Sequence, residues 1–407
     1  MPDAAGPEVA LVAPYPPPDA LHAGSSGVAS YSANLARSLV AAGADVTVIA
    51  PREDGVPEHS TDGPIRVQRA FDRGPGALPQ AARAAARTGA VVHLQHETFL
   101  YGGASALPGL LGGLAWLRRR RPVVVTMHQV VEPGTIDASF TRLHRVPVPA
   151  AAARGALALL QGTIPRLATS TLVLEDRFRD AVPRSVHIPH GVEAAPVVDR
   201  DAARAAIGAA PDELVALCFG YLAPYKGLET ALEAASLLRA APSDAARRVR
   251  LVVAGGPHPR LAASGDDYAD RLRHDYQGSA RFTGYVADTE VHPLFAAADV
   301  VLVLYPRPFS SSGAMALALA HDRPVLLSDA LVATLGASPE LGGASSPATL
   351  AERLRLLAAD PAAGESARRA SRRLATGRSW PEVAQRHLDL YEEVLDGHRP
   401  VQTAPVA

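Results

Sequence analysis

The sequence has almost no cysteine and no excess of charge of either sign. The 407 residues include one cysteine, Cys218, which excludes an intramolecular disulfide and indicates a reducing compartment. Aromatic residues make up only 5% of the chain, and 40 Lys and Arg balance 41 Asp and Glu. Because basic residues are not in excess, the broad cationic surface of a nucleic-acid-binding protein is missing. We therefore expect no nucleic-acid partner.

Long hydrophobic runs are also missing. The most apolar stretches, 106–117 and 150–167, are interrupted by glycine, proline or arginine, so neither supplies the roughly 20 apolar residues that span a bilayer. The amino terminus lacks the basic region and apolar core of a secretion signal. These absences predict a cytoplasmic protein without a transmembrane segment. Arg118–Arg121 suits either peripheral contact with an anionic membrane or a solvated helix end.

Short apolar runs alternate with segments of helical periodicity along most of the chain. Val9–Tyr15, a helix from Val28 to Gly43, and Val46–Ala50 form a first strand–helix–strand unit. The alternation reaches Ile188, and it starts again at Leu214. With 48% hydrophobic residues, the chain can fill two large cores. The sequence therefore predicts an α/β protein with two doubly wound, Rossmann-like domains.

The turn-rich segment 191–199 sets the expected domain boundary. Residues 1–190 would form the first domain and residues 191–379 the second. In doubly wound sheets, ligands bind at the carboxyl ends of the strands. Two such domains facing one another would therefore hold a ligand in a cleft, and the loops that follow strands are the candidates for binding it.

Three of these loops have residues suited to an anion. Gly24–Gly27 directly precedes a helix, where exposed amides and the helix dipole favour a phosphate. Lys226 follows the first strand of the second domain, in a chain whose other basic residues are all arginine. Ser310–Gly313 begins a later helix with hydroxyls and amides that suit a diphosphate or a sugar. The alternative interpretations are tight packing, a solvated lysine and simple helix capping.

Histidines mark the ends of two predicted strands in the first domain. His93, His96 and Glu97 lie at the end of one strand, and His128 follows another. Such side chains can hydrogen-bond sugar hydroxyls or transfer protons. The four residues also form a candidate zinc set, but no HExxH or cysteine pattern accompanies them, so we expect no metal. A hydrogen-bonded structural histidine is the default interpretation of His93.

The order of these motifs resembles a known family. The chain resembles the retaining glycosyltransferases of the GT-B fold, family 4, through GSSG, VVHLQHE, VVVTMH, VHIPHGV, FGYLAPYKGLETALEA, VRLVVAGG, ARFTGYV, a serine–glycine helix start and WPEVAQRHLDLYEEV. The resemblance covers nearly the whole chain. It implies that the first domain binds the acceptor and the second a nucleoside diphosphate sugar. It also implies that a C-terminal helix at about 380–400 returns to the first domain.

The resemblance further implies roles for individual residues. Gly27 matches the loop whose amide approaches the donor diphosphate, Lys226 matches the lysine that binds it, and His128 matches the histidine near the reacting sugar. His96 and Glu97 are expected at the acceptor. The remaining donor contacts are expected from Tyr285, Val286, Ser311, Ser312 and Gly313, where Tyr285 and Val286 belong to the loop that meets the nucleobase largely through its backbone. No cofactor beyond the donor substrate is implied.

Three positions depart from the family pattern. Tyr221 stands where many members have an arginine. Phe309 and Leu317 stand where two glutamates, eight residues apart, are usual. The resemblance therefore points to a subgroup with a Ser-Gly loop in place of the two-glutamate motif, and the departures put the identity of the donor in question.

The expected function is transfer of a hexose from a nucleoside diphosphate sugar to an acceptor hydroxyl, with retention. Amides, hydroxyls and one lysine replace the paired carboxylates that Mg²⁺ or Mn²⁺ would need, so the reaction is expected to be metal-independent. The acceptor would be a small molecule, a glycan or a lipid. Two alternatives stay open. One is another GT-B activity, such as a nucleotide-sugar epimerase or an enzyme coupling to a sugar-like cyclitol, and the other is a catalytically silent binding or partner protein.

Overall fold

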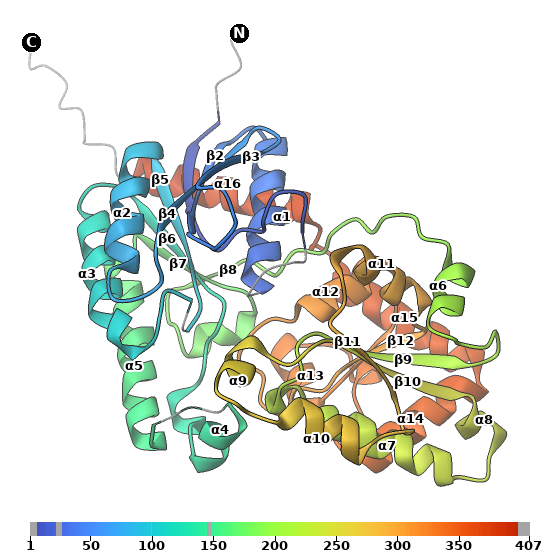
Figure 1. The fold of residues 1–407 in the computed structure, drawn as a ribbon. Helices are drawn as coiled ribbons and strands as arrows, with labels where there is room; N and C mark the ends of the chain where they lie inside the picture. The colour runs from blue at the N-terminus through green and yellow to red at the C-terminus, as the bar shows by residue number, and fades with distance from the viewer. Residues whose placement is uncertain (1–5, 22–26, 99, 145, 147, 398–407) are drawn as a thin grey trace, which may run out of the picture. The chain divides into compact units, whose positions relative to one another are not determined.

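A computed structural model describes residues 6–21, 27–98, 100–144, 146 and 148–397. Packing divides the chain into two units, each built on its own sheet (Figure 1). Unit 1 contains residues 1–131, 156–191 and 380–407, and unit 2 contains residues 132–155 and 192–379. The expected first domain, residues 1–190, included residues 132–155, but the structure groups this segment with unit 2.

Unit 1 is built on an eight-stranded sheet in the order β3-β4-β2-β1-β5-β6-β7-β8. Its strands are β1 (Glu8–Val12), β2 (Asp45–Pro51), β3 (His59–Asp62), β4 (Ile65–Phe71), β5 (Val91–His96), β6 (Val123–Met127), β7 (Ser170–Val173) and β8 (Val186–His187). The central strands are apolar and buried, as a parallel sheet between two helix layers requires. The short polar strand β3 pairs antiparallel with β4 and was not predicted, because HSTD has no apolar alternation.

Helices cover both faces of this sheet. They are α1 (Gly27–Ala41), α2 (Ala77–Thr88), α3 (Leu107–Arg118) and α16 (Trp380–Asp396), with the 3₁₀ turns η1 (Ala104–Ala106) and η3 (Asp176–Asp180). Helix α5 (Ala150–Leu167) begins in unit 2 and ends in unit 1. Leu35 of α1 and Val383 of α16 share one core, and Ala81 of α2 and Leu114 of α3 share the other. The C-terminal helix α16 is therefore a structural part of unit 1.

Unit 2 is built on a parallel five-stranded sheet in the order β11-β10-β9-β12-β13. Its strands are β9 (Leu214–Phe219), β10 (Val249–Ala254), β11 (Arg281–Gly284), β12 (Val300–Val303) and β13 (Val325–Leu327). Its longer helices are α7 (Leu228–Ala240), α10 (Tyr268–Asp275), α11 (Asp288–Ala297), α12 (Gly313–Ala320), α14 (Pro347–Ala359) and α15 (Pro361–Ala375). Its short helices and turns are η2 (Pro133–Thr135), α4 (Ala138–Leu143), α6 (Arg200–Ala206), η4 (Pro224–Lys226), α8 (Asp244–Arg247), α9 (Pro259–Ala263), α13 (Asp329–Leu335) and η5 (Pro339–Leu341). The α/β class with two Rossmann-like units is confirmed.

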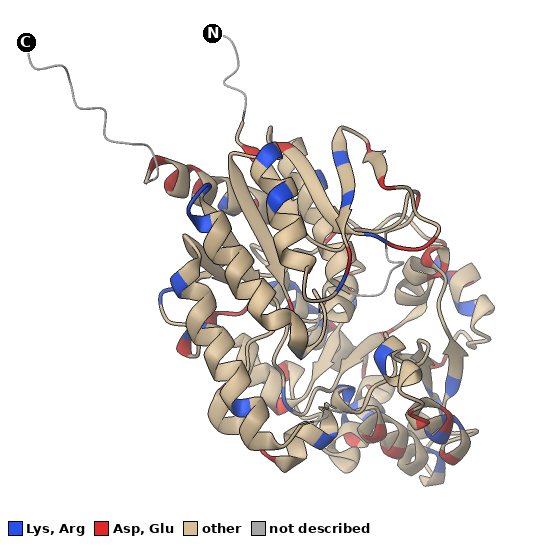
Figure 2. Cartoon of the chain, turned by 60° about the vertical axis from the view of Figure 1, so that its left-hand side comes forward, with Lys and Arg blue, Asp and Glu red and all other residues tan. Residues whose placement is uncertain are grey.

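Charged residues of both signs are interspersed along the chain (Figure 2). The arginine run after α3 covers the end of that helix, since the guanidinium of Arg120 stacks 3.9 Å from the centre of the Trp116 ring and donates to the Trp116 carbonyl. This contact fits the interpretation of a solvated helix end. Among the residues that the structure describes, none of the helices is long and apolar enough to cross a membrane.

The turn from β9 to α7 depends on a close backbone contact. Gly227 precedes α7 and has a φ of +67°. A β-carbon on Gly227 would lie 2.2 Å from the carbonyl oxygen of Leu304, the residue after β12. Only glycine therefore allows α7 to begin this close to the neighbouring strand. Because Lys226 directly precedes this glycine, the same contact fixes where Lys226 lies.

Gly227→Ala should lower the free energy of unfolding by about 3 kcal/mol, because a positive φ and a clash with rigid backbone add together. Gly336→Ala is the matched control. Gly336 has a φ of +59° with nothing within 4 Å of its β-carbon position, so its substitution should cost only about 1 kcal/mol. Urea unfolding of both variants measures the difference. Equal losses would show that the contact with Leu304 does not constrain the turn.

Candidate functional site

Lys226 lies at the carboxyl end of β9, the middle strand of the unit 2 sheet. Its Nζ atom is 2.5 Å from the position that a β-carbon would take on Gly220, so the ammonium rests on bare backbone. The residue is half-buried, and among the described residues its side chain has no carboxylate partner. A half-buried ammonium without a carboxylate partner favours an anionic ligand.

Glycines end the strands beside Lys226. Gly220 follows β9, Gly255 follows β10, and Gly284 is the last residue of β11. The Gly255 amide donates to the Gly284 carbonyl at 2.9 Å, and a β-carbon on Gly255 would lie 2.1 Å from the Gly220 oxygen. The edge next to Lys226 is therefore formed by closely packed backbone, which suits the approach of a phosphate or a base.

Tyr285 and Val286, which follow β11, differ in exposure. The side chain of Tyr285 is 62% exposed, whereas Val286 lies in the core with Val291 and Phe295. The side chain of Val286 is therefore occupied in packing. A ligand at this loop would meet the side chain of Tyr285 but only the backbone of Val286.

Ser312 caps helix α12. Its Oγ accepts a hydrogen bond from the Met315 amide at 3.2 Å and lies 3.1 Å from the Tyr305 hydroxyl. The residue is 2% exposed, so capping accounts for its side chain. Ser311 is half-buried, and Gly313 is exposed with nothing within 4 Å of its β-carbon position. The start of α12 is therefore open at Gly313.

The two positions where glutamates are usual take part in apolar packing. Leu317 is buried in the unit 2 core. Phe309 packs edge-on against His144, with ring centres 4.7 Å apart, and against Tyr225 at 5.8 Å. At the third departure, burial and the nearby Tyr285 raise the pKa of Tyr221, which keeps its hydroxyl protonated. The structure therefore places no carboxylate at these three positions.

Asp137 and His144, two residues of the segment 132–155, contact residues of unit 2, and the sequence analysis did not predict these contacts. Arg307 pairs with both carboxylate oxygens of Asp137, at 3.0 and 3.2 Å. Arg260 donates to the His144 carbonyl at 2.8 Å, and the His144 ring stacks on Tyr225 at 5.4 Å. Burial, with Arg260 and Arg307 nearby, lowers the pKa of His144 to about 4. The sequence around His144 has no motif that signals these contacts.

In unit 1, His128 follows β6 and lies beside the end of β5. Its amide donates to the His96 carbonyl at 2.8 Å, and its Nε2 lies 2.7 Å from Oε1 of Gln95. Burial, together with His190 and His96, lowers the pKa of His128 to about 3, so the imidazole is neutral at ordinary pH. The Tyr31 ring meets the His128 ring edge-on at 4.7 Å.

Helix α1 brings its first turn toward the same place. Tyr31 lies one turn after Gly27, so its contact with His128 sets the start of α1 near the end of β6. Gly27 is exposed, and nothing lies within 4 Å of its β-carbon position. Gly24, Ser25 and Ser26 of the predicted loop lie outside the described residues.

His96 and Glu97, the residues expected at the acceptor, have different surroundings. His96 is buried, its Nδ1 has no hydrogen-bond partner among the described residues, and burial lowers its pKa to about 4. Glu97 accepts a hydrogen bond from Gln129 at 2.6 Å, and the Thr98 amide donates to Gln129 at 3.3 Å. The loops after β5 and β6 are thus cross-linked by neutral and acidic side chains.

His93 is hydrogen-bonded through both ring nitrogens, as a structural histidine would be. Its Nδ1 lies 2.6 Å from the Tyr391 hydroxyl and its Nε2 lies 2.7 Å from the Thr126 hydroxyl. Within the described ranges, no three His, Cys, Asp or Glu side chains come together as a metal site would need, so the candidate zinc set is not assembled there. Gln95, which contacts both His93 and His128, was missed because glutamine has no motif of its own.

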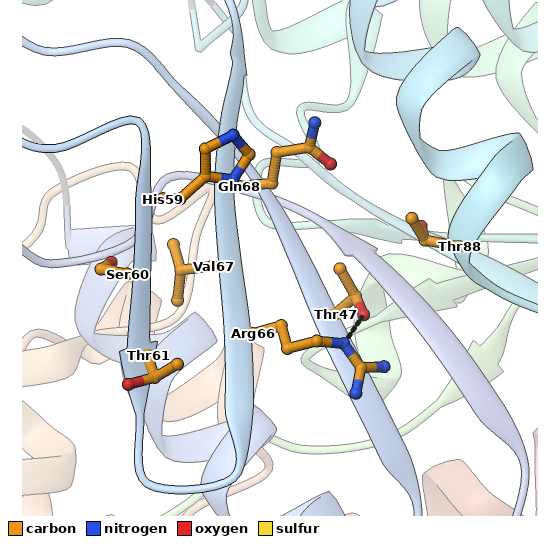
Figure 3. Close-up of a pocket in the computed structure, with 8 residues that line it drawn as sticks. All are labelled: Thr47, His59, Ser60, Thr61, Arg66, Val67, Gln68 and Thr88. Atoms are coloured by element: carbon orange, nitrogen blue, oxygen red, sulfur yellow. Dashed lines mark hydrogen bonds between the residues drawn. The ribbon is translucent and has the colours of Figure 1, made fainter.

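One hollow on unit 1 lies away from these residues (Figure 3). It is lined by Thr47, His59, Ser60, Thr61, Arg66, Val67, Gln68 and Thr88. Thr47 and Arg66 lie near the amino ends of β2 and β4, and Thr88 ends α2. Because ligands of doubly wound sheets bind at the carboxyl ends of the strands, this hollow is not the candidate site.

Two family models match the chain. The model of Glycosyltransferase Family 4 matches residues 25–195, and the model of Glycosyl transferases group 1 matches residues 213–360. Together they span more than three quarters of the chain. The chain is also 28% identical over 322 residues to D-inositol 3-phosphate glycosyltransferase 1 of Catenulispora acidiphila, covering 76% of this chain and 73% of that protein.

Solved structures share the fold. Sucrose-phosphate synthase from Thermosynechococcus elongatus is 19% identical with a TM-score of 0.73, covering 96% of this chain and 99% of that one. HepE of Anabaena in complex with UDP-glucose is 16% identical with a TM-score of 0.66, covering 95% of this chain and 99% of that one. The chain therefore has the GT-B type of fold, and it belongs to the glycosyltransferases of family 4 and group 1.

Proposed function

We propose that this glycosyltransferase moves a hexose from a nucleoside diphosphate sugar to an acceptor hydroxyl, with retention and without a metal ion. The observation that carries the proposal is the half-buried Lys226, whose ammonium lies on the backbone of Gly220 without a carboxylate partner among the described residues. The complex of HepE with UDP-glucose supports a nucleotide-sugar donor.

The diphosphate is the group that needs stabilisation. As the bond from the anomeric carbon to the diphosphate breaks, negative charge grows on the leaving oxygen, while the acceptor oxygen bonds to the same carbon. The acceptor proton leaves with the diphosphate product. Lys226, the start of α12 at Ser311 to Gly313, and the start of α1 at Gly27 would stabilise that charge through one cation and fixed amides. Tyr285 and Val286 would contact the nucleobase, mainly by backbone.

His128 is assigned to the donor sugar. Because its pKa is lowered to about 3, it is a neutral hydrogen-bonding group at ordinary pH and suits a sugar hydroxyl better than a phosphate. His96 and Glu97, at the end of the neighbouring strand, are assigned to the acceptor. D-inositol 3-phosphate, in the name of the Catenulispora relative, supplies a first acceptor to test.

The replaced glutamates favour a second candidate, a catalytically silent binding protein. Phe309 and Leu317 supply no carboxylate for a sugar or ribose hydroxyl. The purified protein should be incubated with a panel of nucleotide sugars, with and without D-inositol 3-phosphate, and the products identified by mass spectrometry. Transfer supports the proposal. Donor turnover without an acceptor indicates another GT-B activity, and a folded protein that binds no nucleotide indicates the silent candidate.

Lys226→Ala should lower turnover by about 10² or more, because the ammonium stabilises charge that develops in the transition state. Lys226→Arg should recover little, since the space over Gly220 suits a compact point charge. Arg271→Ala is the control, because Arg271 is an exposed cation paired with Asp267 on α10. Near-normal kinetics in Lys226→Ala would remove the central residue of the mechanism.

His128→Ala should lower the rate of transfer more than it weakens nucleotide binding, because the imidazole is assigned to the sugar alone. Single-turnover transfer and the affinity for the nucleoside diphosphate are measured on the same variant. Equal losses in both quantities would assign His128 to general packing.

Transfer should persist in excess EDTA, with no more than a severalfold change in rate. Hard divalent cations need carboxylate oxygens near the diphosphate. The nearest paired acids in the sequence, Asp266 and Asp267, are engaged at the start of α10, where Asp266 accepts from the Tyr268 amide and Asp267 pairs with Arg271. Activity abolished by EDTA and restored by Mn²⁺ would show that a metal holds the diphosphate instead of Lys226.

A further inference from the structure

A chain of buried polar side chains leads from α16 to His128. The Tyr391 hydroxyl lies 2.6 Å from Nδ1 of His93, and Nε2 of His93 lies 3.1 Å from the Gln95 amide nitrogen. The other end of the same amide, Oε1, lies 2.7 Å from Nε2 of His128. Gln95 is 0% exposed and His93 is 0% exposed, so water does not compete for these contacts. One amide group therefore joins two imidazoles.

Both imidazoles are neutral, and a neutral imidazole exists as one of two tautomers. Burial lowers the pKa of His93 well below its usual value and that of His128 to about 3. In each ring, one nitrogen then carries a proton and the other a lone pair. The amide of Gln95 meets the Nε2 atom of both rings.

One amide can hydrogen-bond to the Nε2 atoms of both rings only if one Nε2 is protonated and the other is not. Its oxygen accepts and therefore needs a protonated Nε2, whereas its nitrogen donates and therefore needs a lone pair. The requirement holds for either orientation of the amide. Turning it over only exchanges which ring faces the amide oxygen and which faces the amide nitrogen. The Thr126 hydroxyl lies 2.7 Å from the same Nε2 of His93, so Thr126 and Gln95 share the one proton or lone pair of that atom. The hydroxyls of Thr126 and Tyr391 can donate or accept, so they are compatible with either tautomer of His93.

We propose that Gln95 is a positioning residue for His128. Gln95 forces His93 and His128 into opposite tautomers, and so it fixes whether the free Nδ1 of His128 presents a proton or a lone pair to a ligand. Among the described residues, Nδ1 of His128 has no hydrogen-bond partner. Tyr391, on α16, hydrogen-bonds to His93 at the other end of this series of polar side chains. This inference rests on the proposed role of His128 at the donor sugar.

The tautomers can be observed directly in the full-length protein. The chain has 14 histidines, so histidine-only ¹⁵N labelling with His93→Ala and His128→Ala as assignment variants identifies the two rings in long-range ¹H–¹⁵N spectra. The wild type should show one ring protonated at Nδ1 and the other at Nε2. In Gln95→Glu, a carboxylate accepts from both rings, so both should be protonated at Nε2.

The same variants test the effect on transfer. Gln95→Met keeps the volume without the amide and should lower kcat by up to about 10²-fold, because misorientation of a contacting group costs that much. The affinity for the nucleoside diphosphate should not change. Tyr391→Phe should lower kcat less, since it loosens only the far end. Gln161→Met is the control, because among the residues that the structure describes the buried Gln161 amide hydrogen-bonds only to the backbone of Val131.

Gln161→Met should lower the unfolding midpoint while leaving the two tautomers and kcat as in the wild type. Identical tautomers in the two wild-type rings would overturn the inference, and so would full turnover in Gln95→Met. Neither result would touch the proposed function, which is judged on Lys226→Ala and His128→Ala. A loss in Gln95→Met equal in kcat and in nucleotide affinity would also overturn it, because it would mark a structural role.

Discussion

Close packing of backbone carbonyls against glycines sets the geometry of the candidate site in unit 2. The carbonyl of Leu304 occupies the space that a β-carbon on Gly227 would take, and the carbonyl of Gly220 does the same at Gly255. These contacts draw the ends of β9, β10 and β12 together and leave Lys226 resting on Gly220. A cation packed against rigid backbone has less conformational freedom to lose when an anion binds, which favours electrostatic preorganisation.

The two units present different chemical groups at the carboxyl ends of their strands. Unit 2 offers a cation and the exposed start of α12, which suit a diphosphate. Unit 1 offers buried histidines that burial keeps neutral, joined by glutamine and tyrosine. Neutral groups with fixed tautomers discriminate hydroxyls by direction of hydrogen bonding, a task for which charge is poorly suited.

Apolar patterns predicted the buried strands, because apolar periodicity follows directly from burial, and the family resemblance implied the helix α16. The sequence patterns missed β3, whose polar residues carry no alternation. They also gave a boundary that differs from the packing units at residues 132–155, because long-range packing leaves no local pattern. Lys226 and His128 were proposed as site residues from composition and from a family resemblance. Gln95 was not, because its role depends on two imidazoles that the sheet brings to the same amide.

The departures from the two-glutamate pattern change where sugar contacts can come from. Leu317 packs in the unit 2 core, so a glutamate in that place would be a carboxylate desolvated among aliphatic side chains. Phe309 is held by the rings of His144 and Tyr225, both in unit 2. The side chains at both positions therefore take part in packing. In the proposed function, recognition of sugar hydroxyls therefore falls to the backbone at the start of α12 and to neutral groups such as His128, whose hydrogen-bonding direction then matters more.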